Sequence, residues 1–331
     1  MQRNLSNTPE SLPKIFGMGS SQLLAQELCD LSGSEIQQIQ AEKFSDGEVK
    51  LTPMAAVPRE NIWIIHSMAF ESAKSTGDKI WELLMLISLL RDEGAGPITA
   101  VLPYFSYSRS DQKKEAQDPL TLRYLAQLYE AAGIQRIVTV DIHNLAAFQN
   151  AFRCPSINLE ASSLFCDYLS TKHFPDIPLI VMSPDLGGLK RAEKFCRDLQ
   201  TALSRSQPRS ISMAIVEKYR EKEGLRGQAL VGAVKDAHVF IYDDIISTGK
   251  TVLRAADLAR QHGAKFVTVM ATHGLFSEDV EKVLRAPCID EFVVTNSNLS
   301  LLDPKFKEFP KLKILSCVPI LAQGLGIMGI S

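Results

Sequence analysis

Short runs of apolar and β-branched residues alternate along the chain with longer segments in which apolar residues recur at helical spacing. This alternation is typical of βαβ units and predicts a mostly parallel sheet covered by helices. Because the rhythm occurs twice, we predict an α/β fold of two similar doubly wound domains, residues 14–158 and 159–331. In such sheets ligands bind beyond the carboxyl ends of the strands, so we look for chemistry in the residues that follow each strand.

In the N-terminal half, strands are predicted at Lys14–Met18, Asn61–His66, Ile98–Tyr104 and Arg136–Asp141, and helices at Gln22–Leu31, Lys79–Arg91 and Leu122–Ala132. In the C-terminal half, strands are predicted at Pro178–Ser183, Ser210–Glu217, Val239–Asp243, Phe266–Thr272 and Glu291–Thr295, and helices at Leu186–Leu199, Thr251–His262 and Glu278–Leu284. Residues 37–44 and 48–53 are predicted to form a hairpin, because the Asp46-Gly47 dipeptide between them favours a tight turn.

Charge and composition narrow the possible partners. Lys and Arg total 36 and Asp and Glu total 38, which leaves a formal net charge of −2. Proteins held on nucleic acid by its phosphate backbone are usually basic, so we expect no nucleic-acid partner. No apolar stretch approaches the roughly 20 residues of a membrane helix, and the polar residues 1–13 do not resemble a secretory signal. We therefore expect a cytoplasmic protein that does not bind membranes and recognises phosphate only locally.

The segment from Val239 to Thr251 combines acids, hydroxyls and a glycine turn: it reads VFIYDDIISTGKT and leads into a predicted helix. Backbone N–H groups and hydroxyls at a helix N-terminus favour a phosphate dianion. Asp243 and Asp244 can accept hydrogen bonds from vicinal sugar hydroxyls. The segment is not a Walker A motif, because that motif needs a glycine where Asp244 stands. A plain capped turn would explain the hydroxyls, but not two acids at the end of an apolar strand.

This segment resembles the phosphoribosyl-pyrophosphate motif that phosphoribosyltransferases share with ribose-phosphate pyrophosphokinases. The resemblance implies that the two acids hold the ribose 2′- and 3′-hydroxyls and that the loop holds the 5-phosphate. The ribose 5-phosphate site it implies consists of Asp185, Asp243, Asp244, Ser247, Thr248, Gly249, Lys250 and Thr251. Lys250 replaces a residue that is usually small in the pyrophosphokinases. One loop cannot separate the two families, but five further segments resemble the pyrophosphokinases alone.

Two of these segments imply an ATP site. The turn FSDGE is similar to a hairpin that contacts the nucleotide in the family, where an aromatic ring stacks on adenine, possibly that of a neighbouring subunit. The segment PYFSYSRSDQK is similar to the family's basic ATP segment, and an arginine there can bridge triphosphate oxygens. The implied ATP-binding residues are Phe44, Asp46, Gly47, Glu48, Arg109, Ser110 and Asp111. Ser110 stands where the family commonly has Gln. Taken alone, the first segment reads as an ordinary turn and the second as a solvated charged loop.

Two further segments imply a metal site. VDIHN follows a predicted strand, and we expect Asp141 and His143 to share one face of that strand. A lone histidine is more often a core residue than a ligand. SPDLGGLKR follows another strand and turns through two glycines into a helix, which brings backbone close to an anion. The resemblance implies a Mg²⁺ cofactor linked to His143, Asp185 and Asp141; Mg²⁺ takes few protein ligands and keeps phosphate and water oxygens.

The fifth segment, VEKYREKEG, runs from an apolar strand into a highly charged stretch. The resemblance places Lys218 and Arg220 on the family's two catalytic cations. We expect residues 218–227 to be mobile without ligands, because they cannot bury much apolar area. A solvated loop without a catalytic role is the alternative.

Together the matches run in order from about residue 14 to 321. They imply two domains of the phosphoribosyltransferase type and a homo-oligomeric enzyme. They also imply its reaction, transfer of the β,γ-diphosphoryl group of ATP to ribose 5-phosphate, which gives phosphoribosyl pyrophosphate and AMP. One alternative is a phosphoribosyltransferase, which would leave the first 150 residues unexplained. The other is a catalytically silent regulatory paralogue, against which Lys218, Arg220, His143 and Asp185 all argue.

Overall fold

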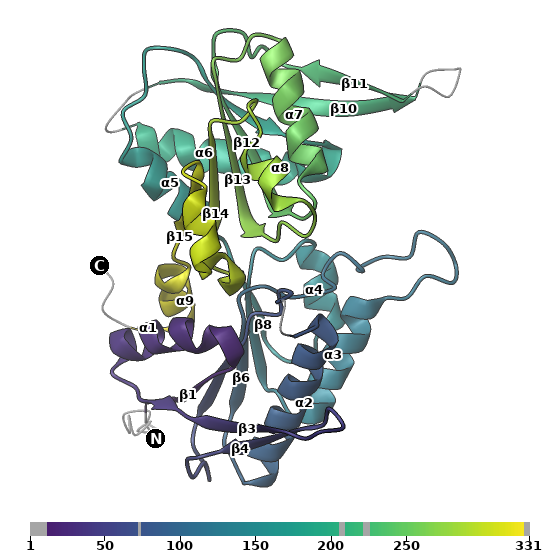
Figure 1. Cartoon of the computed structure of the whole chain (residues 1–331), viewed down its shortest axis with the longest axis vertical. Helices are drawn as coiled ribbons and strands as arrows, with labels where there is room; N and C mark the ends of the chain where they lie inside the picture. Colours follow the sequence, from purple (N-terminus) through teal and green to yellow (C-terminus); the bar gives the residue numbers. More distant parts are fainter. Residues whose placement is uncertain (1–11, 72–73, 205–208, 221–225, 328–331) are drawn as a thin grey trace, which may run out of the picture. The chain divides into compact units, whose positions relative to one another are not determined.

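Two mainly parallel sheets, each in its own unit of the chain, form the framework of the computed structural model (Figure 1). The structure describes residues 12–71, 74–204, 209–220 and 226–327, without the side chains of residues 218–220 and 226–228. Unit 1 comprises residues 1–159 and 318–331, and unit 2 comprises residues 160–317. Each unit is described by itself.

Unit 1 contains a six-stranded sheet with the order β2-β1-β5-β6-β7-β8, in which all neighbours are parallel. Strands β5 and β6 are buried along their whole length, as expected where both faces of a parallel sheet are covered. The elements of this unit are β1 (Lys14–Gly17), α1 (Gln22–Ser32), β2 (Ile36–Gln37), β3 (Ile39–Lys43), β4 (Val49–Pro53), β5 (Ile62–Ile65), α2 (Thr76–Asp92), β6 (Ile98–Leu102), α3 (Thr121–Ala132), β7 (Arg136–Val140), α4 (Leu145–Ala151), β8 (Ser156–Leu159) and α9 (Val318–Leu325).

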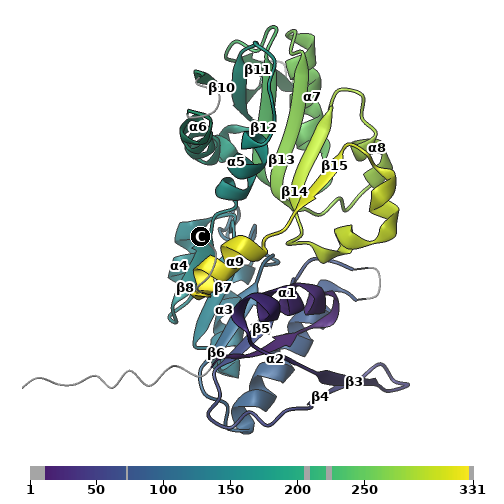
Figure 2. The same cartoon turned by 90° about the vertical axis from the view of Figure 1, so that its left-hand side faces the viewer.

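The C-terminal helix α9 lies beside α1 and β8 of unit 1 (Figure 2). Arg136 of β7 donates a hydrogen bond from Nη2 to the carbonyl of Gly324 at 3.5 Å. Buried side chains such as Ile320 and Leu321 account for this placement, since they need an apolar surface to cover. The structure thus departs from the division expected from the sequence, in which residues 159–331 form one domain.

Unit 2 contains a seven-stranded sheet with the order β11-β10-β9-β12-β13-β14-β15. Its strands are parallel except for β11, which pairs antiparallel with β10 at the edge. The elements of this unit are α5 (Ser162–Ser170), β9 (Leu179–Ser183), α6 (Leu189–Leu203), β10 (Ile211–Arg220), β11 (Arg226–Val231), β12 (His238–Ile246), α7 (Lys250–Gln261), β13 (Phe266–Gly274), α8 (Val280–Leu284), β14 (Glu291–Thr295) and β15 (Leu312–Leu315). The prediction of two doubly wound α/β units is confirmed.

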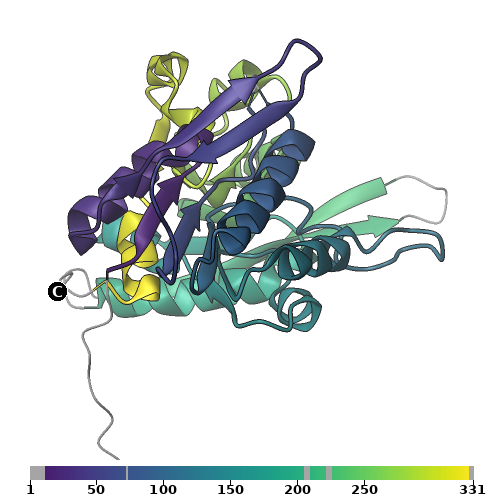
Figure 3. The same cartoon turned by 90° about the horizontal axis from the view of Figure 1, so that it is seen from below.

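Two antiparallel pairs, β3–β4 and β10–β11, form extended ribbons (Figure 3). The first is the predicted hairpin, and Gly47 has the positive φ of 95° that its turn requires. In the second, Lys218 pairs with Gln228 and Arg220 with Arg226. The two ends of the charged stretch are therefore strand residues, and its mobility without ligands stays a prediction. Its middle, residues 221–225, lies outside the described residues.

None of the helices in the described residues is both long and apolar enough to span a bilayer.

Candidate functional site

Two successive carboxylates of β12 share one arginine of α6. Arg191 Nη1 lies 2.9 Å from Asp243 Oδ1 and 3.1 Å from Asp244 Oδ1. Both acids lie inside the strand, which was predicted to end at Asp243. The strand continues to Ile246 because residues 245 and 246 still pair with β13. Arg191 was not among the predicted site residues. Two acids at the buried end of a strand need a cation nearby, and this requirement could have pointed to an arginine such as Arg191.

The acid pair is strongly desolvated. Only 4% of the Asp244 side chain and 18% of the Asp243 side chain are exposed. Burial, and then the neighbouring charge of Asp244, raise the pKa of Asp243, while Arg191 opposes the shift. One arginine therefore does not fully compensate two buried charges. Hydroxyl groups of a ligand that donate to these oxygens would supply the missing stabilisation.

The loop after this strand opens helix α7, as predicted. Gly249 is the N-cap residue with φ 76°, and without a side chain it cannot cap the helix. The helix begins at Lys250, whose Nζ lies 2.7 Å from Glu278 Oε2, with both side chains exposed. Ser247 and Thr248 precede the glycine, and the Ser247 hydroxyl lies 3.4 Å from that of Ser277. Backbone N–H groups and hydroxyls thus gather at the positive end of a helix, where an anion is favoured.

We expect Gly249→Ala to destabilise the protein by about 2 to 5 kcal/mol. Its backbone is left-handed, which costs about 1 to 2 kcal/mol for a residue with a Cβ. The new Cβ would also lie 2.6 Å from Val283 Cγ2, and such overpacking typically costs about 1 to 3 kcal/mol. Urea unfolding measures the change. Gly33→Ala is the matched control, because φ is 71° there and nothing lies within 4 Å of the new Cβ. Equal losses in the two variants would contradict a steric role for Val283.

The segment after β9 lies against the acid pair. Asp185 Oδ1 accepts a hydrogen bond from the Gly188 amide at 3.2 Å and caps a short 3₁₀ turn, Leu186–Gly188. A Cβ on Gly188 would lie 2.9 Å from Ser183 Oγ and 3.8 Å from Asp243 Oδ1. The absence of a Cβ at Gly188 therefore lets the backbone of this turn lie close to Ser183 and Asp243. Unit 2 brings together all the residues predicted to bind ribose 5-phosphate at the carboxyl ends of β9 and β12.

In unit 1, the predicted ATP residues fall into two separate groups. Phe44, Asp46, Gly47 and Glu48 form the exposed turn of the β3–β4 hairpin, with the Glu48 amide donating to Asp46 Oδ1 at 3.1 Å. Phe44 is 43% exposed. Within the described part of the chain, no hydrogen bond or ion pair joins this turn to Arg109, Ser110 or Asp111.

The second group lies near the end of β7. Asn144 Nδ2 donates a hydrogen bond to Asp111 Oδ2 at 2.6 Å. Asn144 was not among the predicted site residues, and it also caps α4 by accepting a hydrogen bond from the Ala147 amide. The expectation that Asp141 and His143 share a strand face is wrong, because β7 ends at Val140 and Asp141 has φ 38°. Both residues lie instead on the turn that leads into α4. Arg109 is exposed and forms no hydrogen bond or ion pair with the residues described.

The metal prediction is compatible with this structure. The described residues contain no group of three His, Cys, Asp or Glu side chains that could hold an ion by themselves. Mg²⁺ prefers oxygen ligands, uses few from the protein and takes the rest from phosphates and water. The half-buried carboxylates Asp141, in unit 1, and Asp185, in unit 2, have this chemistry. Lys218 and Arg220 are described only by their backbone in β10.

Both units are similar to known proteins. The family model for the N-terminal domain of ribose phosphate pyrophosphokinase matches residues 13–133, and that for the phosphoribosyl synthetase-associated domain matches residues 193–325. The ribose-phosphate pyrophosphokinase of Campylobacter jejuni is 33% identical over 311 residues, covering 94% of each chain. That of Mycoplasmopsis pulmonis is also 33% identical, over 93% of this chain and 91% of its own.

A solved structure agrees with these sequence matches. Phosphoribosylpyrophosphate synthetase from Mycobacterium smegmatis aligns with a TM-score of 0.82 and 29% identity, covering 95% of this chain and 97% of that one. The similarity to these relatives therefore extends over both units. The chain belongs to the ribose-phosphate pyrophosphokinase family.

Proposed function

We propose that this protein transfers the β,γ-diphosphoryl group of ATP to the anomeric hydroxyl of ribose 5-phosphate, releasing AMP. The observation that carries the proposal is the desolvated pair Asp243–Asp244, held by Arg191 directly before the glycine-opened N-terminus of α7. A sugar with two adjacent hydroxyls and a phosphate satisfies both features at once. The sugar hydroxyls would donate hydrogen bonds to the carboxylates, and the phosphate would accept hydrogen bonds from the amides and hydroxyls of residues 247–251.

The reaction needs charge stabilisation rather than a covalent nucleophile. The anomeric oxygen attacks the β-phosphorus, and the bond from that phosphorus to the α–β bridging oxygen breaks, so the oxygen leaves with AMP. Lys218, Arg220 and Arg109 are the proposed cations for the transferring and leaving phosphates. Mg²⁺ held by His143 and Asp141 of unit 1, or by Asp185 of unit 2, would neutralise charge on the triphosphate.

The exposed hairpin turn that carries Phe44 supports a homo-oligomeric active form. Phe44 is exposed at a hairpin turn, with no hydrogen bond or ion pair linking that turn to the Arg109 segment among the described residues. A hairpin of this kind is available to a neighbouring subunit, where its ring can stack on adenine. We therefore propose that one copy of the chain completes the ATP site of another. The cytoplasmic location expected from the sequence stays a prediction.

We expect Phe44→Ala to weaken ATP binding by roughly ten- to a hundredfold, since stacking of a base on an aromatic ring is worth about 1 to 3 kcal/mol. Thermal stability should change little, because the ring is 43% exposed. ATP and ribose 5-phosphate titrations of the initial rate separate the two substrates. Phe44→Tyr keeps the ring and should bind ATP normally. Loss of folding in Phe44→Ala would instead identify Phe44 as a core residue.

Product analysis tests the proposed reaction. The purified protein is incubated with ATP, Mg²⁺ and ribose 5-phosphate, and the nucleotides are separated by chromatography. We expect AMP to accumulate with ribose 5-phosphate, and not with ribose, which lacks the phosphate that residues 247–251 would hold. Absence of product at high enzyme concentration would favour the silent paralogue. Consumption of phosphoribosyl pyrophosphate with a free base would favour a phosphoribosyltransferase.

A further inference from the structure

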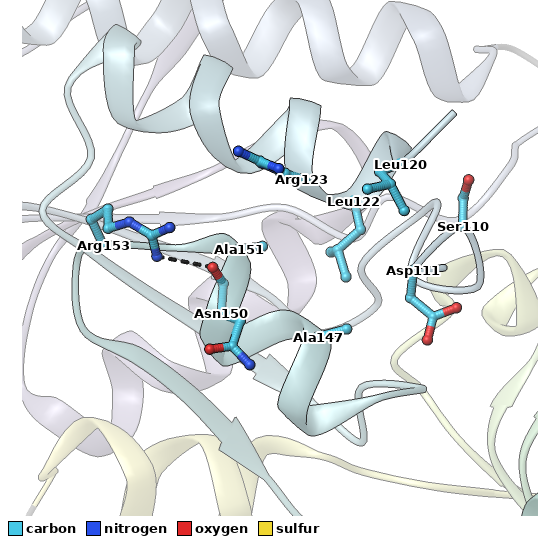
Figure 4. Close-up of a pocket in the computed structure, with 9 residues that line it drawn as sticks. All are labelled: Ser110, Asp111, Leu120, Leu122, Arg123, Ala147, Asn150, Ala151 and Arg153. Carbon is cyan, nitrogen blue, oxygen red and sulfur yellow. Dashed lines mark hydrogen bonds between the residues drawn. The ribbon is translucent and has the colours of Figure 1, made fainter. Parts of the chain in front are cut away.

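A pocket of about 300 Å³ lies in unit 1 beside the turn that carries Asp111 (Figure 4). Its middle is lined by apolar side chains, among them the buried Leu122 and Ala151. Arg123 and Arg153 lie on one side of the pocket, and Asp111 lies on the other. Polar and apolar side chains line the pocket to a similar extent, and its volume lies at the lower end of the range for small-molecule sites.

Among the described residues, Arg123 and Arg153 have no acidic partner. Arg123 forms no hydrogen bond or ion pair within the part of the chain that the structure describes. Arg153 donates from Nη1 to the backbone carbonyls of Asn150 and Phe152, at 2.9 and 3.1 Å. Its Nε and Nη2 groups have no hydrogen-bond partner among the described residues. By contrast, Arg191 and Arg260 are both paired with aspartates. Positive charge on this side of the pocket is therefore not compensated locally.

The nearby acids are bonded to neutral donors. Asp111 Oδ2 accepts from Asn144 at 2.6 Å. Glu130 Oε1 accepts from the backbone amides of Arg153 and Cys154, at 2.5 and 2.7 Å. Because neither carboxylate pairs with a guanidinium of the pocket, an anion from solution is the partner that these arginines lack.

We propose that this pocket binds a small organic anion with a carboxylate or phosphate group and an apolar body. The planar guanidinium groups of Arg123 and Arg153 suit the paired oxygens of either anion. The body lies on Leu122 and Ala151, and the volume accommodates roughly ten water-sized groups. Asp111 favours a hydrogen-bond donor, not a second negative charge, at the far end. The pocket shares Ser110 and Asp111 with the predicted ATP-binding residues, but the proposed function uses neither Arg123 nor Arg153, and it is their role that goes beyond it.

Binding of four probes to the full-length protein tests the proposal. Benzoate and phenyl phosphate carry the two anion types on an apolar ring, benzamide is the neutral counterpart of benzoate, and inorganic phosphate lacks the apolar body. Dissociation constants come from NMR titration. We expect benzoate or phenyl phosphate to bind at least fivefold more tightly than both benzamide and inorganic phosphate. The tighter of the two identifies the anion class.

Arginine variants locate the binding. Arg123→Gln and Arg153→Gln should each weaken binding of the preferred anion at least fivefold. Arg123→Gln should leave the melting temperature unchanged, because the side chain is exposed and forms no hydrogen bond with the described residues, whereas Arg153→Gln should lower it slightly through the loss of two hydrogen bonds to backbone carbonyls. Arg254→Gln, which removes an exposed arginine from α7 in unit 2, should leave it unchanged. Equal binding by all three variants, or by inorganic phosphate and the aromatic anions, would mean an adventitious ion only. Displacement of the probe by saturating ATP and Mg²⁺ would assign the pocket to the ATP site. Either result overturns the proposal.

Discussion

Lys218→Ala and Arg220→Ala should each lower the turnover number by about a hundred- to a thousandfold. Removal of one preorganised donor to developing negative charge commonly has this effect. The Michaelis constants for both substrates should change much less, because these cations would act mainly in the transition state. Both residues lie near the outer end of the β10–β11 ribbon, two positions apart along one strand. Initial rates with each substrate varied in turn measure the separate constants.

The control for these variants is Glu217→Gln. Glu217 is exposed, precedes Lys218 on β10 and lies on the opposite face of the strand. Its turnover should match the wild type, and the melting temperature should be the same in all three variants. Normal turnover in both cation variants would contradict the mechanism and favour the silent regulatory paralogue.

Asp244→Asn should raise the Michaelis constant for ribose 5-phosphate by at least tenfold and leave that for ATP unchanged. The substitution keeps the shape of the side chain but removes a charged acceptor, and hydrogen bonds to charged groups contribute about 1.5 to 3 kcal/mol. Asp236→Asn is the control, because Asp236 pairs with Lys265 on the surface of the same unit. Equal effects on both substrates would assign the acid pair to metal binding instead.

The same variant should change how stability depends on pH. Burial and Asp244 raise the pKa of Asp243 above its usual value of 3.8, so the folded protein binds this proton more tightly than the unfolded chain. The contribution of the pair to the free energy of unfolding is therefore largest in acid and declines as the pH rises from about 4 towards neutrality. In Asp244→Asn the like charge is gone, and this decline should become smaller. Urea unfolding at several pH values across that range measures both slopes, and a steeper decline in the variant would contradict the assignment.

Much of the fold could be predicted because most of the parallel strands are continuous apolar runs. The predicted strands correspond to β1, β5, β6 and β7 in unit 1, and to β9, β10, β12, β13 and β14 in unit 2. The missed elements are β2, β8, β11, β15, α4, α5 and α9, and two of them had weak signals. Strand β2 has two residues, and β11 contains Arg226, Gly227 and Gln228, so neither shows an apolar period. Helix α9 is apolar, but its place in unit 1 depends on contacts with α1 and β8 that no local pattern contains.

For the site too, residues within one sequence segment could be predicted, whereas contacts between segments far apart in the sequence could not. The acid pair and the phosphate loop could be predicted, since one segment carries both. Arg191 could not be assigned, because its role depends on β9 and β12 being neighbours in the sheet. Asp141 and His143 do not share a strand face, because β7 ends at Val140 and Asp141 has a positive φ. Alternation of side chains predicts a shared face only while the strand continues.

The most direct test of diphosphoryl transfer follows one oxygen atom. ATP that carries ¹⁸O in the bridge between its α- and β-phosphorus atoms is incubated with the protein, Mg²⁺ and ribose 5-phosphate. The products are observed by ³¹P NMR, in which ¹⁸O shifts the resonance of the phosphorus bonded to it. Attack on the β-phosphorus predicts equal amounts of AMP and phosphoribosyl pyrophosphate, with all of the label in AMP. Label in the sugar product or in pyrophosphate, or formation of ADP instead of AMP, would contradict the account.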